Sequence, residues 1–261
     1  MNDVLTLGID IGSTTSKCVL MKNASEIIAK SLIPNGIGTS GPERAIKQLL
    51  DGSGHNQTEF SHILATGYGR GICEIADSTM SELSCHAKGA WFLFPEVHTV
   101  VDIGGQDAKV LRIDPNGELS DFVMNDKCAA GTGRFLDVMA RILELNVEDL
   151  GKLGDLSTGR LEISSTCTVF AETEVISQLA RGADRADVIA GVNRSVAHRV
   201  SGLVRRVGAA PLVVMSGGVA LNDGVRRELI NDLGVDIATS PLSQFIGAIG
   251  AALWAHEKAN A

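Results

Sequence analysis

The chain has 261 residues, 44% of them hydrophobic and 21% charged, which is the composition of a folded globular protein with one large or two modest domains. With 29 glycines and only 4% aromatic residues it favours an α/β protein over a β-sandwich. The formal net charge of −8 argues against a nucleic-acid partner. We expect no membrane partner and a cytoplasmic location, because there is no signal-peptide pattern and no run near the ~20 apolar residues of a membrane helix.

The first predicted elements are a strand at residues 5–10 and a return strand at residues 18–21, joined by a tight turn. Gly12 allows the sharp bend. Hydroxyls and backbone N–H groups that suit an anion come from Ser13, Thr14 and Thr15. This is not a Walker loop, because the Gly-x-x-x-x-Gly-Lys spacing is missing and a strand follows. Taken alone, such a turn joins many ordinary hairpins.

A second hairpin at residues 97–111 repeats the frame of the first. Asp10 and Asp102 occupy corresponding positions, and a lysine follows each aspartate after seven residues, at Lys17 and Lys109. We interpret the repeat as an internal duplication with one phosphate-binding hairpin in each half. Chance similarity of two glycine turns is the alternative.

Between the hairpins, the apolar spacing predicts a helix at residues 42–50, a strand at 60–65 and a helix at 80–90. A glycine-rich turn after the strand carries Tyr68 and Arg70, which could contact a nucleotide or a partner or simply belong to a loop. Cys85 and His86 are neighbours on the second helix and point about 100° apart, which favours a structural role over a metal site.

Two cysteines lie in loops of small residues directly before predicted helices. Cys128 precedes a helix beginning near Thr132, whose free N–H groups are expected to face it, and Cys167 precedes a helix ending near Gly182. Zinc and cubane iron–sulfur sites usually take four ligands, and the chain has no Cys-x-x-Cys. Two cysteines per chain suffice on the twofold axis of a dimer, whereas buried, unreactive thiols are the alternative.

The remaining pattern predicts a short helix at residues 147–156, a long helix at 186–208 and a strand at 211–215. The strand runs into a Gly217-Gly218 turn, where a flat ligand can approach the backbone, and a helix is expected to open at Asn222 or Asp223. The last predicted helix, at residues 245–256, is rich in glycine and alanine and suits close packing across the first domain.

The two hairpins and the strand-Gly-Gly-helix turn resemble, in this order, the phosphate and adenosine segments of the actin, sugar-kinase and Hsp70 superfamily. Over essentially its whole length the chain resembles the activator component of 2-hydroxyacyl-CoA dehydratases and the related ATPase subunits of benzoyl-CoA reductase. The matching stretches are GIDIGSTTSK at 8–17, ATGYGR at 65–70, SELSCHA at 81–87, DIGGQDAKV at 102–110, NDKCAAGTGRFLDVMA at 125–140, SSTCTVFAETEVISQL at 164–179 and MSGGVALN at 215–222.

The resemblance implies an α/β protein with the actin/sugar kinase/Hsp70-like duplicated two-lobe ATPase fold and ATP in the cleft. The first lobe would comprise residues 1–96, and the second residues 97–261 with a cluster-binding helical insert at about 125–182. The resemblance further implies a homodimer with one 4Fe-4S cluster, held by Cys128 and Cys167 of each copy.

The implied function is ATP-dependent transfer of one electron from ferredoxin or flavodoxin through the cluster to a 2-hydroxyacyl-CoA dehydratase. Asp10 would organise Mg²⁺ and its waters, and Asp102 would position or activate the attacking water. The implied ATP contacts are Gly12, Ser13, Thr14, Thr15, Lys17, Gly104, Gly105 and Gln106 at the phosphates and Gly217, Gly218 and Asn222 at the adenosine. A small-molecule kinase of the same superfamily, or a nucleotide-dependent redox sensor, is the alternative.

Overall fold

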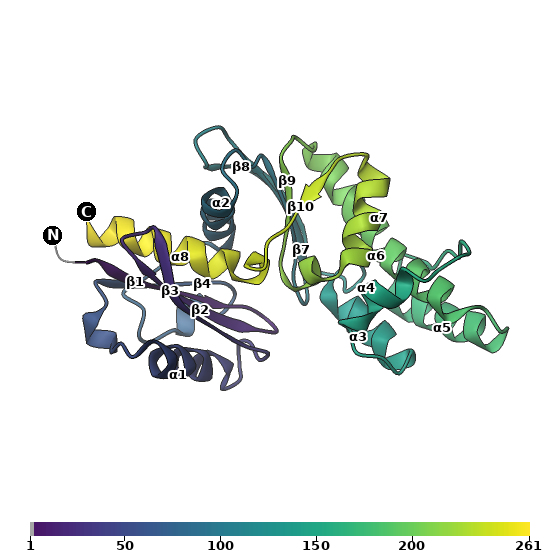
Figure 1. The fold of residues 1–261 in the computed structure, drawn as a ribbon, viewed down its shortest axis with the longest axis horizontal. Helices are drawn as coiled ribbons and strands as arrows, with labels where there is room; N and C mark the ends of the chain where they lie inside the picture. Colours follow the sequence, from purple (N-terminus) through teal and green to yellow (C-terminus); the bar gives the residue numbers. More distant parts are fainter. Residues whose placement is uncertain (1–2) are drawn as a thin grey trace. The chain divides into compact units, whose positions relative to one another are not determined.

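The computed structural model describes residues 3–261, which form two compact units (Figure 1). Unit 1 contains the residues up to Glu96 together with 114–119 and 244–261, and unit 2 contains 97–113 and 120–243. Each unit is built on its own five-stranded sheet. In residues 3–261, no helix has the length and apolar character needed to cross a membrane.

The sheet of unit 1 has the strand order β3-β2-β1-β4-β5. Its strands are β1 Leu5–Ile11, β2 Ser16–Lys22, β3 Glu26–Ile33, β4 His62–Thr66 and β5 Ser78–Thr79. β2 and β3 pair in antiparallel fashion next to β1, while β4 lies parallel to β1 on its other side. Most side chains of β1 and β2 are buried, as expected for strands covered on both faces.

Three helices complete unit 1: α1 Gly41–Ser53, α2 Glu82–Leu93 and α8 Ile246–Ala259. Alternate residues of β1 face opposite sides, and Leu7 and Ile9 join the apolar cluster that includes Leu49 of α1. Gly8 faces α8 so closely that a side-chain Cβ at this position would overlap the carbonyl of Ala248. The small residues of the last helix thus serve close packing on β1, and α8 also packs along α2.

The sheet of unit 2 has the order β8-β7-β6-β9-β10, which repeats the topology of unit 1 strand for strand. Its strands are β6 Thr99–Ile103, β7 Ala108–Ile113, β8 Leu119–Asn125, β9 Val213–Ser216 and β10 Ile237–Ala238. The registers also correspond, because Asp10 pairs with Lys17 and Asp102 pairs with Lys109. The internal duplication predicted from the two hairpins is therefore confirmed.

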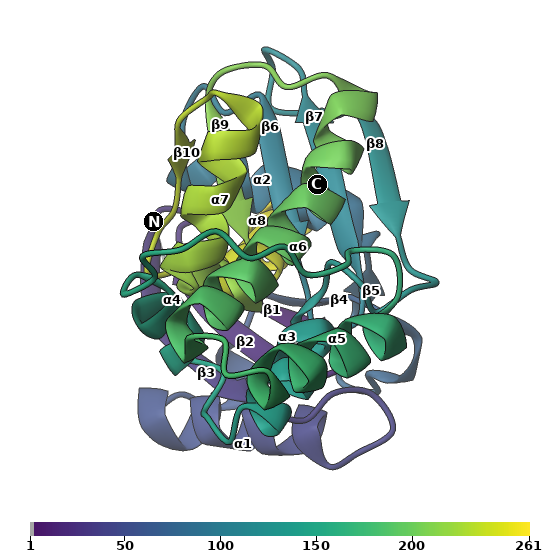
Figure 2. The ribbon, with the colours of Figure 1, turned by 90° about the vertical axis from the view of Figure 1, so that its right-hand side faces the viewer.

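Unit 2 carries five helices: α3 Gly133–Ile142, α4 Asp149–Gly154, α5 Thr168–Ala180, α6 Arg185–Val207 and α7 Asp223–Leu233. Figure 2 shows α6 and α7 crossing in front of this sheet. The main apolar cluster joins the strands to these helices, with Phe135 and Met139 of α3 and Val192 and Val196 of α6 fully buried. The helices α3, α4 and α5 lie between β8 and α6 in the chain and have no counterpart in unit 1.

The predicted helices and strands all occur, with ends shifted by a few residues. The strands β3, β5, β8 and β10 were not assigned from the sequence. All four lie at the edges of the two sheets. β5 and β10 have only two residues each, β8 exposes or half-exposes all seven of its residues, and β3 fully buries only two of eight. An edge strand therefore lacks the continuous apolar run that identifies a central strand.

Candidate functional site

The first hairpin turn, between β1 and β2, holds its backbone in place and leaves its hydroxyls uncommitted. The N–H of Gly12 donates to the carbonyl of Thr15 at 2.9 Å, and the Gly12 carbonyl accepts from the N–H of Ile37 at 2.9 Å. None of the hydroxyls of Ser13, Thr14 and Thr15 hydrogen-bonds to another residue in the range 3–261. All three residues are partly exposed, so a phosphate group can reach them.

Asp10, at the end of β1, presents an unusual carboxylate. It is only 3% exposed, and its Oδ2 accepts from Lys17 Nζ at 3.0 Å. Its Oδ1 is buried and accepts no hydrogen bond from the described residues. A buried carboxylate oxygen without a donor is costly, and carboxylate oxygen is the ligand type that Mg²⁺ and its bound waters prefer. The donor chemistry of this site therefore fits a hydrated Mg²⁺ ion.

Asp102 is at the matching position of unit 2. In contrast to Asp10, both of its carboxylate oxygens lie near a polar side chain. Oδ1 accepts from Ser216 Oγ at 2.7 Å, and Oδ2 lies 3.5 Å from Lys109 Nζ. Lys109 also pairs with Asp107 at 2.7 Å. The two aspartates thus share a strand register but differ in their surroundings.

Each aspartate is flanked by a glycine turn at the end of the neighbouring parallel strand. Thr66 is the partner of Asp10 in the register, and Ser216 is the partner of Asp102. The next residues, Gly67 and Gly217, have φ values of +83° and +81°, and a Cβ on either would crowd the backbone of the aspartate strand. Sequence reasoning missed this equivalence, although a small hydroxyl residue followed by glycine ends both strands.

The proposed adenosine segment is a short 3₁₀ turn, Gly218–Leu221, followed by α7. Gly218 is exposed, so its backbone is open to a ligand. The Asn222 side chain instead serves the fold: Oδ1 caps α7 by accepting from the Val225 N–H at 3.1 Å, and Nδ2 donates to Asn193 Oδ1 at 3.2 Å. The N-cap predicted at Asn222 or Asp223 is therefore at Asn222.

The two candidate ligand cysteines are both partly exposed residues of unit 2. Cys167 is the N-cap residue of α5, while Cys128 precedes the N-cap residue of α3, Thr132, by one short turn. Asn125 shapes that turn, because its Nδ2 donates to the carbonyl of Cys128 at 2.9 Å and to that of Ala130 at 3.2 Å. Cys128 is thus held on a loop, not at the helix start itself.

The start of α3 corrects one expectation. The N–H of Gly133 donates to the Gly104 carbonyl at 2.9 Å, and that of Arg134 to the Gly105 carbonyl at 2.8 Å. These groups were expected to be free and to face Cys128, but they are committed to the second hairpin turn. A contact between segments about 30 residues apart cannot be predicted from the spacing of apolar residues within one helix. The helix next to the cysteine loop is therefore tied directly to a candidate phosphate loop.

The other three cysteines belong to unit 1 and are poor ligands. Cys18 and Cys85 are completely buried, and burial raises the pKa of each thiol to about 12. Cys73 is partly exposed, and burial raises the pKa of its thiol as well.

We expect a thiol reagent at about pH 8 to modify the five cysteines in a fixed order, because the thiolate is the reactive form. In native protein treated with a chelator, Cys128 and Cys167 should react first, Cys73 more slowly, and Cys18 and Cys85 only after unfolding. Peptide mapping by mass spectrometry after a time course measures the order. Early alkylation of Cys18 or Cys85 would contradict it.

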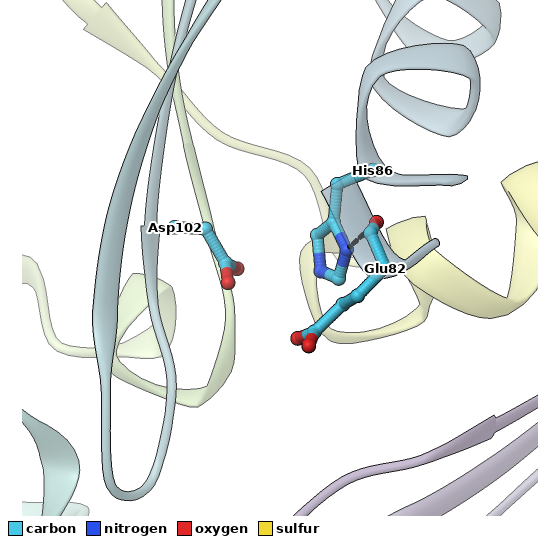
Figure 3. Close-up of side chains that lie close together, drawn as sticks. All are labelled: Glu82, His86 and Asp102. Atoms are coloured by element: carbon cyan, nitrogen blue, oxygen red, sulfur yellow. Dashed lines mark hydrogen bonds between the residues drawn. The ribbon is translucent and has the colours of Figure 1, made fainter. Parts of the chain in front are cut away.

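The structure also places Tyr68, Arg70 and His86, which were singled out in the sequence. Tyr68 is 47% exposed, and Arg70 Nη1 donates to the Gly67 carbonyl at 3.1 Å, which supports the turn. His86 is buried on α2, where its Nδ1 lies 2.9 Å from the Glu82 carbonyl oxygen. Figure 3 shows this hydrogen bond, together with the side chain of Asp102 on β6 of unit 2.

Comparison with known proteins agrees with this architecture. The chain is 61% identical, over 98% of each sequence, to the (R)-2-hydroxyglutaryl-CoA dehydratase activating ATPase of Acidaminococcus fermentans. A solved activator of the 2-hydroxyisocaproyl-CoA dehydratase from Clostridium difficile, with bound ADPNP, matches with a TM-score of 0.96 and 50% identity over 98% of this chain and 96% of that one.

The fold itself extends to more distant proteins. A ROK family glucokinase from Streptomyces griseus has a TM-score of 0.57 at 17% identity, over 97% of this chain and 99% of that chain. The duplicated sheets and this likeness establish the actin/sugar kinase/Hsp70-like fold. Since residues 7–255 also match the family pattern, the chain belongs to the BadF/BadG/BcrA/BcrD ATPase family.

Proposed function

We propose that the protein is an activator that couples ATP hydrolysis to the transfer of one electron, from ferredoxin or flavodoxin to a 2-hydroxyacyl-CoA dehydratase. The observation that carries the proposal is the direct link between a phosphate-type hairpin turn and the helix that follows the Cys128 loop. Similarity to dehydratase activators over almost the whole chain supports the choice of partner.

Within unit 1, the phosphate contacts would come from Gly12, Ser13, Thr14, Thr15 and Lys17, with Asp10 holding Mg²⁺ through its water shell. Within unit 2, they would come from Gly104, Gly105 and Gln106, with Gly217 and Gly218 along the adenosine. Asp102 would position or activate the attacking water. Asn222 would border the adenosine indirectly, since its amide is occupied by α7 and Asn193.

Cys128 and Cys167 would ligate a 4Fe-4S cluster shared by two copies of the chain in a homodimer. When bound, the cluster supplies a one-electron carrier. The donor set fits: within residues 3–261 the partly exposed thiols are Cys73, in unit 1, and these two. Val169 and Phe170, directly after Cys167, are 65% and 67% exposed. Such apolar residues favour burial in an interface, which supports a dimer at this end of unit 2.

The link between the Gly104 turn and α3 makes a separate prediction. Gly133→Pro removes the N–H that binds Gly104 and places the ring Cδ where the Gly104 carbonyl oxygen lies, so the turn must separate from the helix. Proline suits the helix itself at this first position, because Thr132 before it is extended. We expect the variant to keep its iron and to bind ATP within about tenfold of wild type, but to lose most of the ATP-induced change in the electron paramagnetic resonance of the cluster.

The matched control for this prediction is Arg185→Pro, which places proline at the first position of α6 behind the extended residue Asp184. This variant should respond to ATP like the wild type. A normal ATP response in Gly133→Pro would show that α3 does not connect the nucleotide site to the cluster.

The proposed function as a whole is tested by purifying the protein under strict anaerobiosis and measuring iron and acid-labile sulfide. We expect about four iron atoms per dimer and a signal from the reduced cluster that changes when ATP is added. Absence of iron after reconstitution, with ATP binding intact, would overturn the proposal and favour the small-molecule kinase. ATP binding without turnover, in the presence of the dehydratase, would favour the redox sensor.

A further inference from the structure

A buried histidine lies beside the Asp10 carboxylate within unit 1. His86 is in the second turn of α2, it is 6% exposed, and Cys85 before it packs against α8. In the SELSCHA stretch the adjacent Cys85 is a buried thiol whose raised pKa keeps it protonated. Of the two neighbours, His86 is therefore the residue that could take part in a reaction.

The hydrogen bond to Glu82 fixes which ring nitrogen carries a proton. The Glu82 carbonyl oxygen can only accept, so His86 Nδ1 must donate across the 2.9 Å contact. This holds for the neutral ring and for the charged ring. Any further chemistry of the imidazole is therefore at Nε2. Figure 3 shows the ring and the Glu82 carboxylate extending from the same side of α2.

Gly247, at the start of α8, marks how near the ring lies to Asp10. A Cβ built on this glycine would lie 2.8 Å from Cε1 of His86 and 3.0 Å from Oδ2 of Asp10. His86 Cε1, the ring atom bonded to both Nδ1 and Nε2, and Asp10 Oδ2 thus both lie within 3.0 Å of the same built position. The other oxygen of Asp10, Oδ1, is buried and has no partner among residues 3–261.

We infer that His86 is a positioning residue for ATP hydrolysis, which acts through Nε2 on water held at the Asp10 carboxylate. The inference rests on the proposed ATPase activity. In that reaction water adds to the γ-phosphorus, the bond to the β-phosphate oxygen breaks, ADP leaves with the electron pair, and the proton lost from water passes to solvent. His86 forms no bond to phosphorus and restricts the orientations available to the water.

Two substitutions separate this role from a purely structural one. The amide of His86→Asn can replace Nδ1 and keep the contact with the Glu82 carbonyl, but it offers nothing at the place of Nε2. The longer His86→Gln places its amide near the position of Nε2. A structural role predicts that asparagine is the better replacement, and the positioning role predicts that glutamine is.

The experiment measures kcat and KM for ATP hydrolysis by the holoenzyme, the ATP affinity by calorimetry and the melting temperature for each variant. We expect His86→Asn to lower kcat about 100-fold, and His86→Gln to stay within about tenfold of wild type, with ATP affinity preserved in both. His62→Asn is the matched control, because His62 lies at the opposite end of β4 from the Asp10 pair and should leave kcat unchanged.

Equal kcat values for wild type and His86→Asn, or a lower kcat for glutamine than for asparagine, would overturn the role of Nε2. Loss of ATP affinity in step with kcat would also overturn it, because His86 would then serve binding. Failure of the wild-type protein to hydrolyse ATP would overturn both the proposed function and this inference, so the wild-type rate distinguishes the two failures.

Discussion

Iron is expected to disappear from the protein when Cys128 or Cys167 is replaced by alanine, while ATP binding persists. In a homodimer each substitution removes two of the four thiolates, so the content should fall from about four iron atoms per dimer to near zero. Little structural cost is expected, because the Cys167 side chain accepts no capping hydrogen bond at the start of α5 and neither thiol is fully buried. Iron analysis and calorimetry with a non-hydrolysable ATP analogue measure the two properties.

Cys73→Ala is the matched control for the iron prediction, since Cys73 is partly exposed but belongs to unit 1. It should retain all of the iron. A full complement of iron in both Cys128→Ala and Cys167→Ala would rule out the cluster assignment. Loss of iron from Cys73→Ala would show that the ligand set extends to unit 1.

Turnover of ATP is expected to fall about 100- to 1,000-fold in Asp102→Asn, with nucleotide affinity within about tenfold of wild type. The asparagine can still accept from Ser216 Oγ, but it cannot attract a proton of the attacking water. Removal of the charge does not leave Lys109 unpaired, because Asp107 lies 2.7 Å from its Nζ. A steady-state phosphate-release assay, together with calorimetry, separates kcat from binding.

Asp10→Asn should change the Mg²⁺ dependence of nucleotide binding. Because Asp10 Oδ1 is the buried oxygen without a donor, its variant is expected to need more Mg²⁺ for nucleotide binding. Asp232→Asn, on α7, is the control and should change neither property. Full ATP turnover by Asp102→Asn would remove this residue from the reaction and leave Asp10 as the candidate.

The central part of the fold could be predicted from the sequence because it depends on short-range patterns. Asp10 and Lys17 recur as Asp102 and Lys109, and an equal spacing within two hairpins produces equal registers. The cap of α7 also follows from a residue next to the helix, Asn222. Such features need only neighbours in the chain to form.

The remaining features depend on contacts between distant segments. Nothing local distinguishes Gly133 as a donor to Gly104, or relates Gly67 to Gly217, because these relations arise only when the strands pair. His86 was assigned a structural role from the helix geometry of its own neighbourhood. Its position beside Asp10 comes from α2 and α8 packing together within unit 1.

The route of the chain through the two units has a consequence for the order of assembly. Unit 2 is almost continuous in sequence, whereas unit 1 includes α8, which covers β1 and β4. During synthesis residues 97–243 are made before α8, so the unit begun first is completed last. Until then one apolar face of β1 stays uncovered. A released chain that ends at residue 243 would therefore present a complete second unit and an incomplete first one, whose uncovered apolar face is a natural binding target for a chaperone.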